Sequence, residues 1–375
     1  MVHPRRHAKL IFLMLAGAVS IVFLMVGVYQ MIEFMDSTAF CGRLCHQVMN
    51  PEYTMHQVSP HSQVPCAECH VGRGADYLVR SKLSGIPLIF ITALGTYDRP
   101  IPTPVKNLRP ARDICEQCHQ PGRFSGDLVR VHTTYKTDEQ NTKQIDSRIL
   151  RIGAGAQGIA QGIHWHIGAN VWYLAMDEKR QEIGWVGVQN DTNELVTEYI
   201  DPNKAAELIH TESQRIEKEK RLMDCLDCHT RITHIFESPE TLIDTAFDHG
   251  KIDSSIPFIK REGMKALDPV NSSLAEAYAK VEAIRDFYAT SYPAIYVAQG
   301  RAIEDAIAQL KEMARLTTFP EMNVSWKTYI DNIGHLKSPG CFRCHGKLEA
   351  ISGLNQGKIL SADCTLCHYV LPEAK

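Results

Sequence analysis

The sequence lacks an excess of charge of either sign and lacks any unpaired cysteine. Its 375 residues carry 40 Lys and Arg against 43 Asp and Glu, a formal net charge of -3, so we expect no nucleic-acid partner. All 12 cysteines fall into close pairs. With 44% hydrophobic and 22% charged residues the composition is that of a globular protein, long enough for two or three compact units.

Every cysteine pair is followed at once by a histidine. The pairs are Cys41 and Cys45, Cys66 and Cys69, Cys115 and Cys118, Cys225 and Cys228, Cys341 and Cys344, and Cys364 and Cys367, followed by His46, His70, His119, His229, His345 and His368. Five have the spacing C-x-x-C-H, and the first has one extra residue between its cysteines. This spacing is typical of covalent c-type haem attachment, in which two thioethers hold the porphyrin edge and the adjacent histidine binds the iron.

Two other cysteine chemistries fit the pattern less well. A structural zinc site needs two such pairs for each metal and does not require a histidine after each pair. A disulfide framework needs no histidines. The sequence therefore predicts six covalently bound haem c groups.

A long uncharged segment near the N-terminus predicts a membrane anchor. Residues 10–29 contain no charged side chain, and a helix of that length spans about 30 Å, one hydrocarbon core. Basic residues precede the segment and acidic residues follow it, namely Arg5, Arg6 and Lys9 before, and Glu33 and Asp36 after. The positive-inside rule then places the N-terminus in the cytoplasm and the chain after about residue 35 outside.

The alternative for this segment is a cleaved signal peptide. Ala16, Gly17 and Ala18 resemble a small-residue cleavage site, but the apolar run continues for eleven residues beyond them. We therefore favour a retained single-pass anchor. Either interpretation exports the chain, in agreement with the outside location that covalent haem attachment requires.

The spacing of the motifs divides the chain. We expect an anchor in residues 1–35, a three-haem cluster with a quinol-site candidate in 36–130, a β insertion, helix and fourth haem in 131–235, and a helical two-haem unit in 236–375.

Secondary structure is expected between the motifs. Residues 171–176, 182–188 and 194–200 are rich in β-formers and predict a small antiparallel meander. Asp201 and Pro202 predict a helix start, and residues 271–290 and 299–316 predict amphipathic helices. The expected fold is mainly α and loop-rich, with one transmembrane helix and a small antiparallel β insertion.

The histidine count permits a second axial ligand for every haem. Of 17 histidines, six belong to motifs and two lie on the cytoplasmic side. Because a buried ferric iron favours a second nitrogen ligand, we expect most of the others to ligate. The favoured distal ligands are His61, His164, His166, His234 and His335. For His56 and His132, ligation and no ligation are about equally expected.

The N-terminal half resembles the NapC/NirT/NrfH family of membrane-anchored multihaem quinol dehydrogenases. The resemblance covers residues 40–119, and more loosely reaches 229: an anchor helix, a juxtamembrane haem motif with a nearby methionine, and a serine-x-histidine segment. Segments 332–345 and 364–368 resemble larger multihaem members from metal- and sulfur-respiring bacteria. The resemblance implies Met49 as a ligand of the first haem, in place of His46.

The resemblance also implies a quinol site beside the first haem. Lys82 corresponds to a family lysine, and Asp76 and Asp98 are the candidate proton acceptors. Residues 86–94 form an apolar stretch too short to span a bilayer, which is either an interfacial segment able to hold an isoprenoid tail or an ordinary core segment.

These features predict a protein of the bacterial cytoplasmic membrane with its haem domain in the periplasm. It would oxidise quinol from the membrane pool and pass electrons through six haems to a periplasmic or outer-membrane redox protein. A tethered electron relay without a quinol site is the alternative. A terminal reductase is less favoured, because histidines suffice to close every iron.

Overall fold

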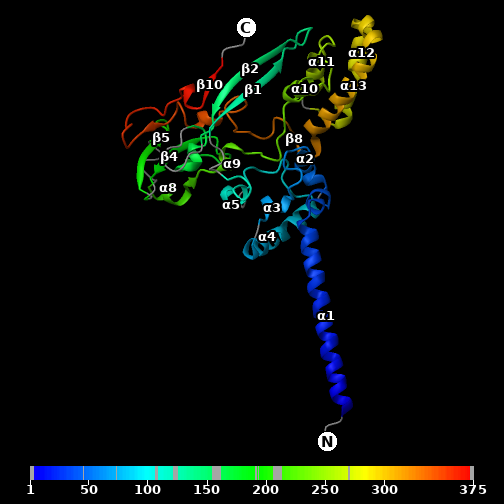
Figure 1. Ribbon diagram of the computed structural model, residues 1–375, viewed down its shortest axis with the longest axis vertical. Coiled ribbons are helices and arrows are strands. Elements are labelled where there is room, and N and C mark those ends of the chain that lie inside the picture. Colours follow the sequence, from blue (N-terminus) through cyan, green and yellow to red (C-terminus); the bar gives the residue numbers. More distant parts are fainter. Residues whose placement is uncertain are drawn as a thin grey trace.

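The protein consists of a slender helix below a broad head (Figure 1). The computed structural model describes residues 4–44, 46–72, 74–105, 109–120, 126–153, 162–190, 192, 194–205, 213–268 and 271–371. The slender helix, α1 (Pro4–Asp36), is apolar and exposed over most of its length, and its most apolar 18-residue window has a mean hydropathy of 2.7. The hydroxyl of Ser20 donates to the carbonyl of Ala16, so this polar group is satisfied within the helix. By length and composition α1 can cross a membrane.

Short helices at the base of the head carry the first three haem motifs. A π-helical turn, Phe40–Leu44, precedes α2 (His46–Gln57), α3 (Cys66–His70), α4 (Ala75–Leu94) and α5 (Ala111–Cys115). Helix α4 ends at Gly95, whose φ of 67° is a left-handed conformation that glycine adopts without strain. In Figure 1, α4 lies beneath the head at a wide angle to α1.

A five-stranded antiparallel sheet contains the predicted meander. Its order is β6-β3-β4-β5-β9, with strands β6 (Arg221–Leu222), β3 (Asn170–Ala175), β4 (Ile183–Gln189), β5 (Leu195–Ile200) and β9 (Glu349–Ala350). The three predicted strands lie within about one residue of their expected positions. Motif four forms α9 (Cys225–Cys228) directly after β6. Thus β6, which leads into the fourth motif, and β9, from the C-terminal segment, form the two edges of one sheet.

A second sheet was not predicted. Strands β1 (Asp127–Tyr135) and β2 (Lys143–Arg151) form a long hairpin, and β10 (His368–Val370) pairs with β2. The helix predicted from Asp201 mostly lies outside the described residues, which resume with α8 (Ser213–Glu219).

The remaining helices form a lobe that contains no haem motif. They are α10 (Pro239–Asp248), α11 (Ile259–Leu267), α12 (Leu274–Ser291) and α13 (Pro293–Thr317). Helix α12 is capped by Ser273, whose hydroxyl accepts from Glu276 N. Ile243, Val281 and Leu310 are buried in the core of this lobe. These helices therefore have an apolar core of their own.

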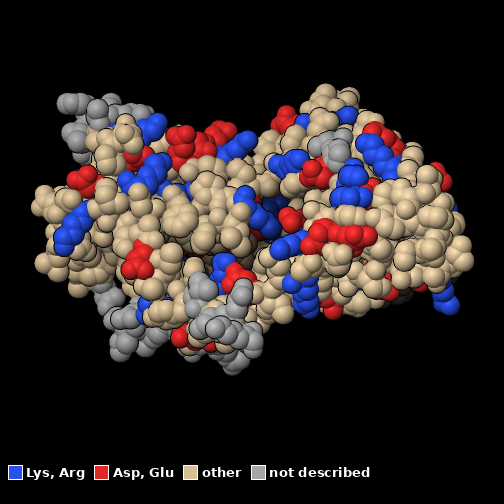
Figure 2. Space-filling view, turned by 90° about the horizontal axis from the view of Figure 1, so that it is seen from above, with Lys and Arg blue, Asp and Glu red and all other residues tan. Residues whose placement is uncertain are grey.

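The two ends of the head differ in structure. Figure 1 places the sheets on one side and α12 and α13 on the other, and Figure 2 shows a hollow between these two parts from above. Basic and acidic side chains are interspersed on that face, with no broad area of one sign. Because β9 and β10 join sheets built by the middle segment, motifs five and six lie against the middle segment rather than against the helical lobe.

Candidate functional site

Most motif histidines lie opposite a second histidine. The ring centres are 6.4 Å apart for His70 and His234, 6.0 Å for His61 and His119, 5.9 Å for His166 and His345, and 6.1 Å for His335 and His368. His164 and His229 are close enough for their charges to interact. A metal–imidazole bond is about 2.0 Å long, so two imidazoles on opposite faces of one iron have ring centres about 6 Å apart.

These pairs suit a haem better than the other cysteine chemistries. Among the described residues, no cysteine forms a disulfide, and no three His, Cys, Asp or Glu side chains gather as a metal site. Haem iron needs only two protein ligands, because the porphyrin supplies four nitrogens. The cysteines and the histidine pairs are therefore a donor set that fits haem c.

Backbone carbonyls orient three of the histidine rings. The Nδ1–H groups of His234, His166 and His345 donate to carbonyl oxygens at 2.9, 2.9 and 2.6 Å. Since a carbonyl only accepts, Nδ1 carries the proton and Nε2 keeps a lone pair for a metal. Burial, together with the charge of Arg231, lowers the pKa of His234 to about 3, which keeps that imidazole neutral.

His56 and His132, for which the sequence does not decide between ligation and no ligation, have different surroundings. His56 is buried and its ring lies 6.4 Å from that of His234, but its Nε2 is 3.0 Å from the carbonyl of Val64. That nitrogen therefore donates a proton, so the geometry favours His234 opposite His70. His132 is exposed on β1, directly opposite Asp146, which suits a solvated histidine.

Cysteines of successive motifs lie next to one another. The thiols of Cys115 and Cys225 are hydrogen-bonded. The members of the following cysteine pairs lie close enough for one to raise the pKa of the other: Cys69 and Cys118, Cys228 and Cys341, and Cys341 and Cys367. The neighbouring cysteines therefore follow the order of motifs two, three, four, five and six.

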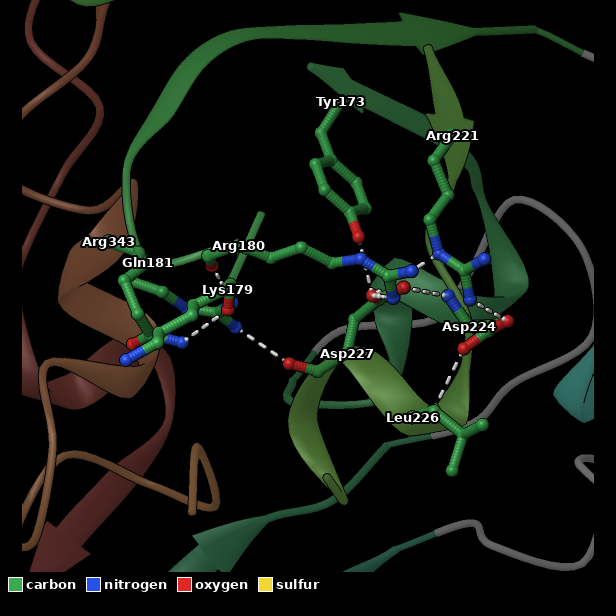
Figure 3. A network of polar contacts seen from close by, with 9 residues as sticks. All are labelled: Tyr173, Lys179, Arg180, Gln181, Arg221, Asp224, Leu226, Asp227 and Arg343. Atoms are coloured by element: carbon green, nitrogen blue, oxygen red, sulfur yellow. Dashed lines mark hydrogen bonds and ion pairs between the residues drawn. The ribbon is translucent and has the colours of Figure 1, made fainter. Parts of the chain in front are cut away.

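A buried carboxylate organises the fourth motif (Figure 3). Asp227, which is 4% exposed, accepts a 2.6 Å hydrogen bond from the Tyr173 hydroxyl and lies 3.5 and 3.4 Å from Arg180 and Arg221. Its other oxygen accepts from Asp224 N, and the Asp224 side chain accepts from Leu226 N, which caps α9. Burial raises the pKa of Tyr173, so its hydroxyl remains a donor.

An arginine of motif five reaches into this network. Arg343 donates to the carbonyl of Asp227 at 2.7 Å and to that of Arg180 at 2.8 Å. Figure 3 shows the guanidinium beside the loop that carries Arg180. A positive charge therefore lies between motifs four and five, where it would favour the reduced form of a haem held there.

Replacing Arg343 by Met should lower the reduction potentials of the groups held by motifs four and five. Removing one charge about 10 Å from an iron, at an effective dielectric constant of about 20, shifts its potential by roughly 70 mV. Potentiometric titration of the purified protein measures the shift. The matched control is Arg343→Lys, which keeps the charge. Identical titrations of Arg343→Met and the unaltered protein would rule out this electrostatic role.

A lysine and an acid meet where α1 enters the head. Lys82 on α4 forms an ion pair with Asp36 at the end of α1, and these side chains are 26% and 25% exposed. The Cys41 thiol lies 3.9 Å from the carbonyl of Met35. The first haem motif, a cation and an acid therefore gather at the base of the head, next to two exposed apolar helices.

The acid beside Lys82 is not one of the two predicted from the sequence. Asp76 pairs with Arg80 at 3.1 Å on the same helix, and both side chains are largely exposed. Asp98 is exposed beyond the end of α4. Asp36 lies 46 residues before Lys82, so helix periodicity could not link them. The available signal was its position directly after the apolar anchor.

The surroundings of the first motif are described in part. Cys45 and the side chain of His46 lie outside the described residues. Met49 is half-buried and packs against an apolar cluster that includes Val48 and Met55. His46 and Met49 are three residues apart in α2. The choice between them stays a prediction.

Comparisons with known proteins agree with this arrangement. Residues 3–106 match the NapC/NirT cytochrome c family, N-terminal region. The chain is 40% identical over 370 residues to the cytochrome c-type protein ImcH of Geobacter sulfurreducens. The aligned region covers 98% of this chain and 71% of that protein. No solved structure matches.

Proposed function

Since the chain belongs to the NapC/NirT family of membrane-anchored multihaem electron-transfer cytochromes, we propose that it oxidises membrane quinol and passes the electrons to a redox partner. The observation that carries the proposal is the Lys82–Asp36 ion pair beside the first haem motif. The pair also joins α4 to the end of α1, but its partial exposure beside the first motif leaves both side chains within reach of a quinol.

The two side chains have complementary tasks at a quinol. Oxidation of a quinol to a quinone releases two electrons and two protons. The Lys82 ammonium can donate a hydrogen bond to a quinol oxygen and stabilise the negative charge that develops there, and the Asp36 carboxylate can accept a proton. Both side chains are about a quarter exposed, so the proton can leave to solvent.

The remaining residues hold the electron carriers. Six haem c groups, attached by the six cysteine pairs, would supply one-electron carriers when bound. We assign His234, His61, His164, His166 and His335 as distal ligands to motifs two to six, in that order, because each lies opposite the corresponding motif histidine. The adjoining cysteines give the electron path from motif two to motif six.

The proposed topology follows from the anchor. The N-terminus would lie in the cytoplasm and the head in the periplasm, where the last motif could deliver electrons to a periplasmic or outer-membrane protein. Cys364 is exposed, in keeping with an exit at motif six.

Quinol-driven reduction tests the proposal. The purified, haem-loaded protein in detergent is mixed with a reduced menaquinol or ubiquinol analogue, and the haem absorption bands are followed. We expect reduction by at least one analogue, with dithionite giving the full extent. If neither analogue reduces the protein, alone or with its native acceptor, the relay interpretation replaces quinol oxidation.

A further inference from the structure

We propose that α4 is a second membrane-embedded helix, which lies within the outer leaflet and does not cross the bilayer. The partner of this surface is lipid. The membrane placement of α4 does not depend on quinol oxidation, so either proposal can fail without the other.

The surface of α4 is apolar and uncovered. None of the Asp76–Leu94 span is buried in the protein. Leu83 is 63% exposed, Phe90 64% and Leu94 75%. Monomeric soluble proteins rarely leave so large a continuous apolar surface in water.

The exposed side chains surround the helix. Leu88, Ile89, Phe90 and Ile91 are consecutive and all exposed, and at about 100° per residue they point to nearly every side of the helix axis. A helix that docks onto a protein partner needs only one apolar stripe. A surface that is apolar all round fits a lipid environment, which covers every side at once.

The distribution of charge sets the depth. The N-terminal part of α4 carries Asp76, Arg80 and Lys82, whereas residues 83–97 contain no charged side chain. Residues 83–94 rise about 18 Å along a helix. The hydrocarbon core is about 30 Å thick, so this charge-free part of α4 is too short to cross it and can lie within the outer leaflet.

The chain returns to the head directly after α4. Gly95 ends the helix, and Tyr97 and Ile101 then pack against the apolar cluster of α2. The hydroxyl of Tyr329 donates to the carbonyl of Ile101 at 3.2 Å. Both ends of α4 therefore lie on the same side of the membrane, which excludes a crossing helix even though its length and composition would permit one.

The lipid partner is continuous with the anchor. The Lys82–Asp36 ion pair joins α4 to the end of α1, so the bilayer that surrounds α1 also meets α4. Figure 1 shows α4 on the underside of the head, next to the end of α1 that joins the head. The wedge between the two helices would open into the outer leaflet, from which a quinol could approach Lys82.

Photochemical labelling by lipid tests this placement. The full haem-loaded protein is reconstituted in phosphatidylcholine vesicles that contain a phosphatidylcholine with a diazirine on its acyl chain. After illumination, peptide mapping by mass spectrometry locates the adducts. We expect adducts in α1 and in residues 83–94, and none near Leu354, an equally apolar residue that is fully exposed in the loop after β9.

A variant and its control sharpen the test. Phe90→Glu should abolish labelling of residues 83–94 and leave labelling of α1 unchanged, whereas Leu354→Glu should alter neither. The haem spectrum reports whether each variant has folded. Labelling of residues 83–94 no stronger than that around Leu354 in the unaltered protein would overturn the proposal. So would protein–protein cross-links between two copies through α4 in place of lipid adducts.

Discussion

Replacing Lys82 by Met should slow the reduction of the protein by quinol by about a hundredfold or more, which is the usual contribution of a positioned proton-transfer or charge-stabilising group. The variant loses the cation that meets the quinol oxygen, and it also leaves Asp36 without its ion-pair partner. Stopped-flow absorbance of the haem bands, with a menaquinol analogue as reductant, measures the rate. Reduction by dithionite should be unchanged, because it does not require the quinol site.

Asp76, an acid on α4 that does not contact Lys82, supplies the control for this experiment. Asp36→Asn should also slow quinol-driven reduction, because it removes the proton acceptor. Asp76→Asn should not, since Asp76 contacts Arg80 and is largely exposed. Equal losses for Asp36→Asn and Asp76→Asn, or a normal rate for Lys82→Met, would contradict the assignment of this ion pair to quinol chemistry.

The sequence pattern predicts those features of the protein that depend on residues close together in the chain. A haem motif occupies five or six consecutive residues, so attachment sites can be inferred from spacing alone. The distal ligands are less local, yet the number of histidines limits the choice. Four of the five histidines favoured from the sequence, His61, His166, His234 and His335, have ring centres 5.9–6.4 Å from those of motif histidines. His56 and His132 differ from them through contacts that no motif encodes.

The parts that sequence reasoning missed depend on contacts between distant segments. Asp36 meets Lys82 only because α4 folds back to the end of α1. Strands β9 and β10 are short and gain their partners from β5 and β2, far earlier in the chain. The segment of residues 86–94 is the end of a helix of 20 residues. Pro87 favours a helix boundary at this position, and the polar residues in the first turns of α4 interrupt the apolar pattern that would predict one continuous helix.

Removing a distal ligand should have the clearest spectroscopic effect. The ring planes of His335 and His368 make an angle of 26° and their centres lie 6.1 Å apart, a separation that suits two ligands of one iron. Replacing His335 by Gly should open the iron of motif six. It should add a high-spin, five-coordinate signal from a single haem to the electron paramagnetic resonance spectrum, and the other haems should keep their signals.

Three further variants separate ligation from a structural role of the ring. His335→Met should restore six coordination and raise the potential of that haem by on the order of 100 mV, because a thioether is a weaker donor to ferric iron than an imidazole. His132→Gly and His56→Gly should add no high-spin signal, since the first ring is exposed and the second donates its Nε2 proton to Val64. A spectrum of His335→Gly that stays entirely low-spin would show that another residue caps the iron. A high-spin signal already present in the unaltered protein would instead identify an iron with an open site, which is the condition for the terminal-reductase interpretation.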